Sequence, residues 1–482
     1  MGLLDHPGAV AGEEPREDRT VRIAIIGGGI SGVTAAYRLH SLLPNAEISV
    51  IDQARYLGGK IKTGTLAGRS IETGAEAFLC RDPIVVDLAF DLGLQVIHPS
   101  AEPAALALGG TLKPIPKGTL VGVPSSREMV AGIAELTPEP VTDGPLLGPE
   151  SDISVGELVR ARYGGEIVDR LVDPLLGGVY AGRADQLSLA ATIPALAAKA
   201  RRYDTLAGAV RAALDSGGSA LAGVPGPIFG SIAGGMSVLV NALAEASGAR
   251  LRLGVAVREL SREGEGWQLV LGATHHPEIV HADAVILAVP ARPAARLLAR
   301  VAPMAAAEIG ALDYASIALV SLALPACELP ELSGFLVPVS EGYVTKAVTF
   351  FDQKWPERAT PGMTMLRASV GRYGEEHVLQ RSDADLIDLV RTELSALIGT
   401  RLPTPMDAAV HRWGGALPQY EVGHLDRVRR ARTVLEETQG LALAGAGFDG
   451  VGIPACVRSG MRAADALLGV ESSAGSGALD AR

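Results

Sequence analysis

The chain has 482 residues, of which 48% are hydrophobic, and a mean hydropathy of +0.26, so it can bury more than one hydrophobic core. Its net charge of −11 excludes nucleic acid as a partner, because neutralising phosphates requires a basic surface. Its three cysteines are odd in number and far apart, which favours a reducing cytoplasm without disulfides. We therefore expect a cytoplasmic globular protein with two or three domains.

The two ends of the chain are predicted to lie outside the folded domains. Residues 1–20 are polar and acidic and have no apolar core of a signal peptide, so we interpret them as a disordered leader. We expect residues 471–482 to form a flexible tail. No apolar stretch approaches the roughly 20 residues that span a bilayer. Peripheral contact with a membrane stays an open alternative.

The stretch from Val21 to Asp52 has the pattern of a dinucleotide-binding unit. An apolar strand over residues 21–26 precedes the glycines of a GxGxxG motif, and a helix and a second strand over residues 46–51 follow. The glycines allow a tight turn and close approach of the backbone to a pyrophosphate, which the helix N-terminus attracts. Asp52 ends the second strand at the spacing of a ribose-binding acid. At this point either NAD or FAD fits.

A second glycine pair follows in the sequence Gly58-Gly59-Lys60. A single NAD site has no use for this loop, whereas in flavoproteins with two dinucleotide folds such a loop passes beneath the ribityl chain. The pair therefore favours FAD. Further along, Gly74 is able to let the backbone approach an isoalloxazine ring, although its residue type fits a simple turn equally well.

The middle of the chain leaves the nucleotide-binding unit. Residues 82–97 predict a helix that ends at Gly93 and a short strand, and residues 105–123 predict a hairpin. Residues 125–216 are helical and rich in alanine, with breaks at 138–149 and at the glycines 177–178. We expect the latter break to leave Tyr180 and Arg183 on irregular backbone, which forms either a ligand wall or a loop between helices.

The second half returns twice to the nucleotide-binding unit. A helix over 237–247 comes first, followed by strands over 251–257, 267–271 and 282–289 and a helix over 292–302. Residues 313–420 are rich in strands and contain one helix over 383–397, which predicts an antiparallel sheet roofed by a helix beside a large apolar pocket. A strand over 440–446 then leads to a helix whose first N–H groups, from Val451 to Ile453, are able to face the flavin pyrimidine.

These elements predict an α/β fold with a Rossmann-like FAD-binding domain assembled from discontinuous segments, an antiparallel-sheet substrate domain and a helical subdomain. The expected FAD-binding segments are residues 21–98, 228–305 and 435–470. The substrate domain is expected over 99–124 and 306–434, and the helical subdomain over 125–227.

Six motifs together resemble one family: GGGISG with its terminal acid, GGKIKT, GGVYAG, GGMSVLVNAL, RWGGALPQYEVGH and GFDGVGIPACVRSG. They are similar to motifs of the bacterial porphyrinogen oxidases of the FAD-dependent amine oxidase superfamily. The first and last motifs are shared with the whole superfamily, whereas GGVYAG and PQYEVGH narrow the resemblance to the porphyrinogen group. The resemblance covers nearly the whole chain after residue 20.

The resemblance implies two sets of site residues. The residues implied to hold FAD are Gly27, Gly28, Gly29, Ile30, Ser31, Gly32, Asp52, Gly59, Lys60, Gly74, Ala75, Val257, Trp413, Val451, Gly452 and Ile453. Among them, Val257 is expected to contact adenine through its backbone and Trp413 to pack near the flavin. Asp52 stands where relatives usually have Glu. The resemblance places Phe350 and Leu336 at the substrate, and the glycine-rich segment described above adds Tyr180 and Arg183 as expected substrate contacts.

The implied reaction is the oxidation of coproporphyrinogen III to coproporphyrin III in haem biosynthesis. Each of three two-electron steps would pass a hydride to flavin N5 while a pyrrole N–H loses a proton. Aromatisation supplies driving force, so we expect no catalytic side chain. None of the nine histidines has the spacing of a nucleophile pair or a metal site, so we expect no metal. We expect no second dinucleotide-binding unit for NADPH, which makes O2 the expected acceptor and hydrogen peroxide the product.

Other functions stay open at this stage. Within the family the alternative substrate is protoporphyrinogen IX, which has fewer propionates. An oxidase of amines or carotenoids is the next enzyme class, although 4% aromatic residues make an aromatic cage for amines hard to build. A flavin-bearing binding protein is the non-enzyme alternative. Handover of the product to other haem-pathway enzymes is a further open question.

Overall fold

The computed structural model describes residues 20–141, 143–216 and 227–470, so the expected tail and nearly all of the expected leader lie outside the described residues. In these ranges no helix combines the length and apolar character that crossing a membrane requires. The strands are β1 (Arg22–Ile26), β2 (Glu47–Asp52), β3 (Thr63–Leu66), β4 (Arg69–Glu72), β5 (Phe78–Leu79), β6 (Val96–Ile97), β7 (Ala104–Leu108), β8 (Thr111–Pro114), β9 (Phe229–Ile232), β10 (Arg250–Leu253), β11 (Val257–Glu263), β12 (Gly266–Leu271), β13 (Glu278–Ala282), β14 (Ala284–Leu287), β15 (Tyr314–Pro325), β16 (Gly334–Leu336), β17 (Thr345–Phe350), β18 (Met363–Val370), β19 (Asp407–Pro418) and β20 (Leu441–Leu443).

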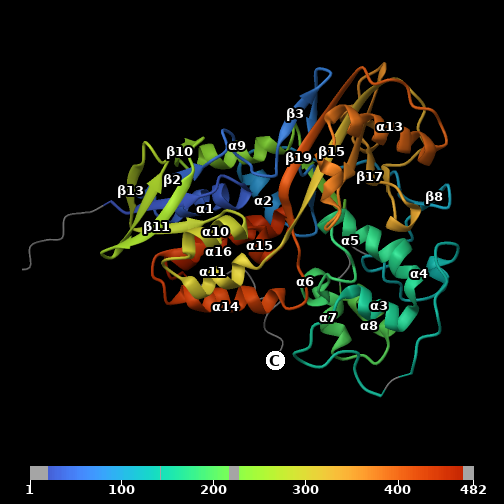
Figure 1. The fold of residues 1–482 in the computed structure, drawn as a ribbon, viewed down its shortest axis with the longest axis horizontal. Coiled ribbons are helices and arrows are strands. Elements are labelled where there is room, and N and C mark those ends of the chain that lie inside the picture. The colour runs from blue at the N-terminus through green and yellow to red at the C-terminus, as the bar shows by residue number, and fades with distance from the viewer. Residues whose placement is uncertain (1–19, 142, 217–226, 471–482) are drawn as a thin grey trace, which may run out of the picture.

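The α-helices connect these strands and form a separate cluster. They are α1 (Ile30–Leu42), α2 (Ile84–Asp91), α3 (Val155–Tyr163), α4 (Gly165–Ile167), α5 (Asp173–Tyr180), α6 (Leu189–Thr192), α7 (Pro194–Ala200), α8 (Leu206–Asp215), α9 (Met236–Ala246), α10 (Ala291–Leu298), α11 (Pro303–Gly310), α12 (Phe351–Lys354), α13 (Asp383–Ile398), α14 (His424–Glu436), α15 (Ala446–Asp449) and α16 (Ile453–Leu467). Figure 1 shows three regions: a sheet with helices around it, a second sheet with α13, and the cluster from α3 to α8 below the second sheet.

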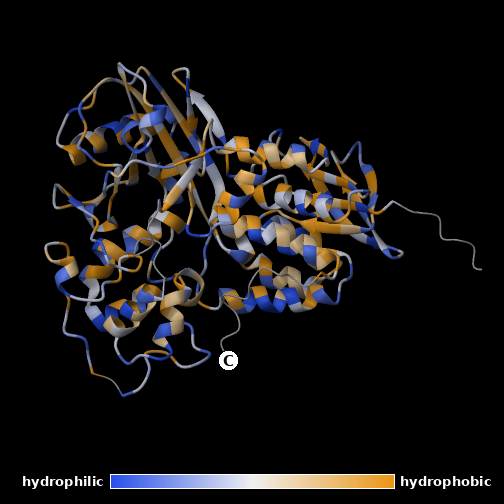
Figure 2. Ribbon diagram, turned by 180° about the vertical axis from the view of Figure 1, so that it is seen from behind, coloured by the Kyte–Doolittle hydropathy of each residue, from blue (hydrophilic) through white to orange (hydrophobic). Residues whose placement is uncertain are grey.

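A parallel sheet forms the core of the nucleotide-binding domain, in the strand order β10-β2-β1-β14-β20. These strands come from three distant parts of the chain, as expected for a domain built from discontinuous segments. Helices α1, α9 and α16 cover one face, and the antiparallel sheet β11-β12-β13 with α10, α11 and α14 covers the other. Both faces are buried, which explains the nearly unbroken apolar sequence of β1. Hydrophobic residues follow these central strands in Figure 2.

The second sheet has seven strands in the order β19-β15-β18-β17-β16-β7-β8. Helix α13 packs on one face, as predicted. The expectation of an antiparallel sheet is wrong at one pair, because β16 and β7 run parallel. Strand β7 comes from the earlier hairpin, more than two hundred residues before β16, so the long intervening chain allows a parallel pairing that a short turn does not.

The helical subdomain has its own core, formed by α3 to α8. The sequence analysis expected Gly177 and Gly178 to interrupt a helix there, and this prediction is wrong, because α5 runs through both glycines and includes Tyr180. The helix ends at Tyr180, and the next residue, Ala181, takes a left-handed conformation with φ 52°. A helix interior tolerates glycine when close packing compensates, and Gly178 faces the side chain of Leu336.

Helix α14 lies across the expected boundary between two domains. Its buried residues Val428, Ala431 and Leu435 join the core formed by β14, α10 and α11 on the nucleotide-binding side. The expected boundary at 434 places nearly all of α14 in the substrate domain. In the structure α14 packs on the nucleotide-binding domain instead.

The first residue of α14, His424, gives a testable dependence of stability on pH. Its ring is 3% exposed, stacks on Tyr420 at 4.2 Å between centroids, and leaves Nδ1 without a partner among the described residues. Burial, followed by the charge of Arg427, lowers the pKa of His424 from 6.5 to about 4. Between these two pH values the unfolded chain binds the proton and the folded chain does not. We therefore expect the free energy of unfolding to fall by up to ~3 kcal/mol as pH drops from 6.5 to 4.

Chemical unfolding at several pH values checks this expectation. The variant His424→Asn should flatten the dependence between pH 6.5 and 4, whereas the same change at the exposed His275 should leave it as in the wild type. Equal slopes in His424→Asn and wild type would contradict the expectation.

Candidate active site

The turn between β1 and α1 leaves a concave surface of bare backbone. Gly27 has φ 114°, and a Cβ atom placed on Gly29 would find only the Cα atom of Gly59, 4.0 Å away. The glycine loop over residues 58–76 begins beside this turn, because the Gly58 N–H donates to the carbonyl of Gly28 at 2.8 Å. Helix α1 has no side-chain cap and no acid in its first turn, so the N–H groups of Ile30, Ser31 and Gly32 are available to an anion.

The carboxylate of Asp52 lies at the end of β2, beside this turn. It accepts hydrogen bonds from the N–H groups of Gly28 at 2.6 Å and Ala54 at 2.7 Å. Each oxygen keeps a further lone pair, so both are able to accept a ribose hydroxyl. The backbone of Val255 also donates to the carbonyl of Asp52 at 3.0 Å, which brings the first residue of β11, Val257, to the same side. This geometry fits a ribose and an adenine.

Gly74 lies at a close approach between two backbone segments of the chain, and the approach of its backbone to an isoalloxazine ring stays a prediction. A Cβ atom at Gly74 would overlap the carbonyl oxygen of Lys60, which accepts a hydrogen bond from the N–H of Ala75 at 2.9 Å. It would also lie 3.4 Å from the ring of Trp413, whose Nε1 donates to the carbonyl of Thr73 at 2.6 Å. Trp413 therefore fixes the glycine loop at Gly74.

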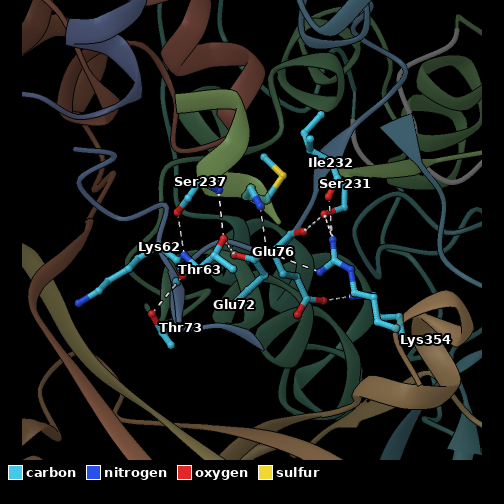
Figure 3. A network of polar contacts seen from close by, with 12 residues as sticks. Lys62, Thr63, Glu72, Thr73, Glu76, Ser231, Ile232, Ser237 and Lys354 are labelled. Atoms are coloured by element: carbon cyan, nitrogen blue, oxygen red, sulfur yellow. Dashed lines mark hydrogen bonds and ion pairs between the residues drawn. The ribbon is translucent and has the colours of Figure 1, made fainter. Parts of the chain in front are cut away.

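A buried ion-pair network holds the same loop from the second sheet. Glu76 pairs with Lys354, as Figure 3 shows, and with Arg367 of β18. Burial alone raises the pKa of Glu76, but the charges of Arg367 and then Lys354 outweigh it and lower the pKa to about 2. Arg367 also donates to the carbonyls of Glu72 at 2.8 Å and Gly74 at 3.2 Å. Arg367 is not among the predicted site residues, although an arginine inside the apolar strand MTMLRASV is a signal of a buried partner.

Glu72 connects the loop to the N-terminus of α9. Its carboxylate accepts from the Met236 N–H at 2.9 Å and from the hydroxyl of Thr63 at 3.0 Å (Figure 3). The backbone N–H of Thr63 in turn donates to the hydroxyl of Ser237 at 2.8 Å. Glu72 is fully buried, and burial raises its pKa. The glycine loop is thus held by both the nucleotide-binding domain and the second sheet.

The N-terminus of α16 forms the third part of the cradle. The helix begins at Ile453 after Gly452, with no side-chain cap and no acid in its first turn. A Cβ atom at Gly460 of this helix would overlap the backbone carbonyl of Ser31, so α16 lies directly against α1. The predicted residues Val451, Gly452 and Ile453 therefore lie at a second free helix N-terminus beside the first one.

Three of the four predicted substrate residues gather around α5. Leu336 contacts this helix, 3.5 Å from a Cβ placed on Gly178, and Tyr180 is its last residue. Arg183 follows the helix and pairs with Asp173 at 3.6 Å and Glu375 at 3.7 Å.

The fourth, Phe350, is elsewhere, and its assignment as a substrate contact needs correction. Its ring is 0% exposed and packs edge-on against Phe335 at 5.8 Å, in the core under α13. Side chains alternate along a strand, so Phe350 points away from its neighbour Thr349, which pairs with Arg367 on the side of the glycine loop.

A glycine cradle with an acid at its edge and two free helix N-termini, next to a second sheet, defines an FAD-binding oxidoreductase fold. The family model described as flavin containing amine oxidoreductase matches residues 30–468, and the chain belongs to that family. The α/β fold, the FAD cofactor and the resemblance to porphyrinogen oxidases are confirmed.

Individual relatives match nearly the whole chain. A coproporphyrinogen III oxidase of Mycobacterium tuberculosis is 37% identical over 92% of this chain and 96% of its own length. The protein of the same name from Bacillus subtilis is 31% identical over 93% of this chain and 98% of its own. A crystal structure of a protein from Exiguobacterium sp. 255-15 has 32% identity and a TM-score of 0.81, covering 93% of this chain and 99% of that one.

Proposed function

We propose that this protein is an FAD-dependent oxidase that converts coproporphyrinogen III to coproporphyrin III in haem biosynthesis. The observation that carries the proposal is the shared name of relatives that match over nine-tenths of the chain. The cradle of three converging segments supports it, because each segment offers backbone N–H groups or a carboxylate where a dinucleotide needs them.

The chain's own residues would bind and orient the two reactants. The glycines from Gly27 to Gly32 and the N-termini of α1 and α16 would hold FAD, with Asp52 at the ribose. Bound FAD supplies a two-electron acceptor at N5. Trp413 and Arg367 would fix the glycine loop against it. Leu336 and Tyr180 would contact the apolar body of the tetrapyrrole, and Arg183 would face its carboxylates.

No side chain is assigned an acid or base role in this proposal. Conversion of the porphyrinogen to the porphyrin removes six hydrogens in three two-electron steps, and aromatisation drives the proton loss from the pyrroles. We propose O2 as the acceptor, which balances the reaction with three O2 consumed and three H2O2 released.

The free thiols of Cys80, Cys327 and Cys456 support our proposal that the enzyme works in the cytoplasm. Peripheral membrane contact and handover of the product are further parts of the proposal.

Anaerobic mixing of the holoenzyme with coproporphyrinogen III tests this function. We expect the flavin absorbance to bleach, and admission of O2 to restore it with the appearance of porphyrin fluorescence and hydrogen peroxide. Unchanged flavin absorbance would indicate a binding protein. Faster turnover of protoporphyrinogen IX would assign the other family substrate, and consumption of amines alone would contradict the proposal.

A further inference from the structure

A cluster of three cations, Lys346, Arg183 and Arg372, lies where α5 meets the second sheet; we call it the α5 cation cluster. Lys346 is 6% exposed, and its Nζ donates to the carbonyl of Gly177 on α5 at 3.2 Å. This is its one side-chain hydrogen bond among the described residues. An ammonium group has three N–H donors, so two of them have no acceptor in a buried place. A buried polar group in this state indicates a partner that the chain itself does not supply.

The backbone of β17 explains why Lys346 points to α5. The pairing register of β17 with β18 shifts between Thr345 and Ala347, which places a bulge at Lys346. Bulges interrupt the alternation of side chains and are frequent beside functional sites. The following residues Val348 and Phe350 return to the core under α13, whereas Lys346 extends to the other face. In Figure 1, α5 lies directly below β17.

The carboxylates near the cluster act on the two arginines, and Lys346 forms no ion pair among the described residues. Arg372 is 7% exposed and donates to the carbonyls of Val337, Tyr343 and Val344, none of which neutralises its charge. Three acids lie near the cluster. Asp173 pairs with Arg183, and Glu375 lies 3.7 Å from Arg183 and 3.9 Å from Arg372. The charge of Glu393 on α13 also acts on Arg372, and its carboxylate accepts from the N–H groups of Val344 and Thr345. Burial raises the pKa of Asp173, although the N–H of Ala184 and the charge of Arg183 oppose this shift. None of these carboxylates forms an ion pair with Lys346 within the part of the chain that the structure describes.

The α5 cation cluster lies beside the residues that would contact the substrate, which is where an anionic group of the substrate would be bound. Two residues that would contact the apolar body of the substrate are also at this helix. Tyr180 is the last residue of α5, and Leu336 packs against α5 at Gly178. A hollow lined in part by Gly371, Arg372 and Glu375 opens on the Arg372 side of the cluster, and Lys346 is not among its lining residues. Burial, followed by the charge of Arg372, lowers the pKa of Lys346 to about 7, so an arriving anion would favour its charged form.

We propose that Lys346 binds a propionate carboxylate of the tetrapyrrole, with Arg183 and Arg372 completing the positive site. The inference rests on the function proposed above and deepens it by naming a residue that selects carboxylate-bearing substrates. An isolated carboxylate supplies the acceptors that the ammonium lacks, in a charge-assisted hydrogen bond.

Binding of the stable product separates charge recognition from shape. The holoenzyme is titrated with coproporphyrin III and with its tetramethyl ester, which has the same ring and no carboxylates, and porphyrin fluorescence is followed. We expect Lys346→Met to weaken binding of the free acid by roughly ten- to a hundredfold, the range for loss of a charge-assisted hydrogen bond. Binding of the ester and the FAD content should stay unchanged. The KM for coproporphyrinogen III should rise more than kcat falls.

Matched variants complete the experiment. Lys346→Arg keeps the charge and should retain most of the preference for the free acid, and Lys117→Met removes an exposed lysine and should change nothing. Lys346→Gln gives the same comparison if the methionine variant does not accumulate. Equal binding of the free acid by variant and wild type, or equal weakening of acid and ester, would overturn the inference, the latter because Lys346 would then only support α5. If the wild type does not oxidise coproporphyrinogen III, the proposed function is wrong. If the wild type oxidises it and Lys346→Met still prefers the free acid over the ester as strongly as the wild type does, only the assignment of Lys346 is wrong.

Discussion

Replacing Gly29 with valine is expected to give a folded protein that carries no flavin. The backbone of Gly29, with φ −70° and ψ 173°, is open to any residue, and a Cβ there would find only the Cα of Gly59 at 4.0 Å. The chain itself therefore tolerates the side chain. The branched group would instead fill the place of the pyrophosphate above the N-terminus of α1. We expect FAD affinity to fall at least about 100-fold, which corresponds to roughly 3 kcal/mol.

The ratio of flavin to protein absorbance measures the loss, and circular dichroism and thermal unfolding of the flavin-free forms measure the fold. Gly32→Ala is the matched contrast, because its Cβ would overlap the carbonyl oxygen of Gly27 and thus disturb the turn itself. We expect this variant to lose stability even without flavin, whereas Gly29→Val should melt like the flavin-free wild type. A yellow, fully loaded Gly29→Val protein would contradict the placement of the cofactor.

The parts of the site that the sequence predicts are those built from neighbouring residues. The turn from Gly27 to Gly32, the acid Asp52 and the helix start at Ile453 all depend on short stretches, in which glycine spacing and apolar runs limit the backbone to few conformations. Their type and order could therefore be read from the sequence. The helix α13 and the hairpin β7–β8 were predicted for the same reason.

The parts that the sequence did not predict depend on contacts between distant residues. Glu76 and Arg367 are 291 positions apart, and no local pattern pairs them. The burial of Phe350 depends on which face of β17 meets α13, and the bulge at Lys346 changes that alternation within the strand. In the same way, α5 stays helical through Gly177 and Gly178, and Gly178 packs against Leu336, which is distant in the sequence. The glycine loop was thus foreseen, whereas the side chains that hold it were not.

Replacing Arg367 with methionine should destabilise the protein and loosen the glycine loop together. The side chains of Arg367 and Glu76 are 11% and 8% exposed, so removal of the arginine leaves a buried carboxylate with Lys354 as its remaining ion-pair partner in the network. Loss of one member of a buried ion pair costs about 3 kcal/mol or more. The carbonyls of Glu72 and Gly74 also lose their donor, so FAD should bind more weakly. Chemical unfolding of the flavin-free protein and titration with FAD measure the two effects separately.

A double-mutant cycle with Glu76→Gln identifies the cause of this loss. If the unpaired charge of Glu76 dominates, the double variant Arg367→Met/Glu76→Gln should recover part of the stability lost in Arg367→Met, because the amide no longer needs a counter-ion. It should not recover FAD affinity, since the two loop carbonyls still lack the guanidinium. Arg250→Met, at an exposed position of β10, controls for the loss of an arginine and should leave both quantities unchanged. Additive effects of the two substitutions on stability would show that Glu76 and Arg367 act independently, and wild-type FAD affinity in Arg367→Met would mean that Trp413 and Glu72 hold the loop without it.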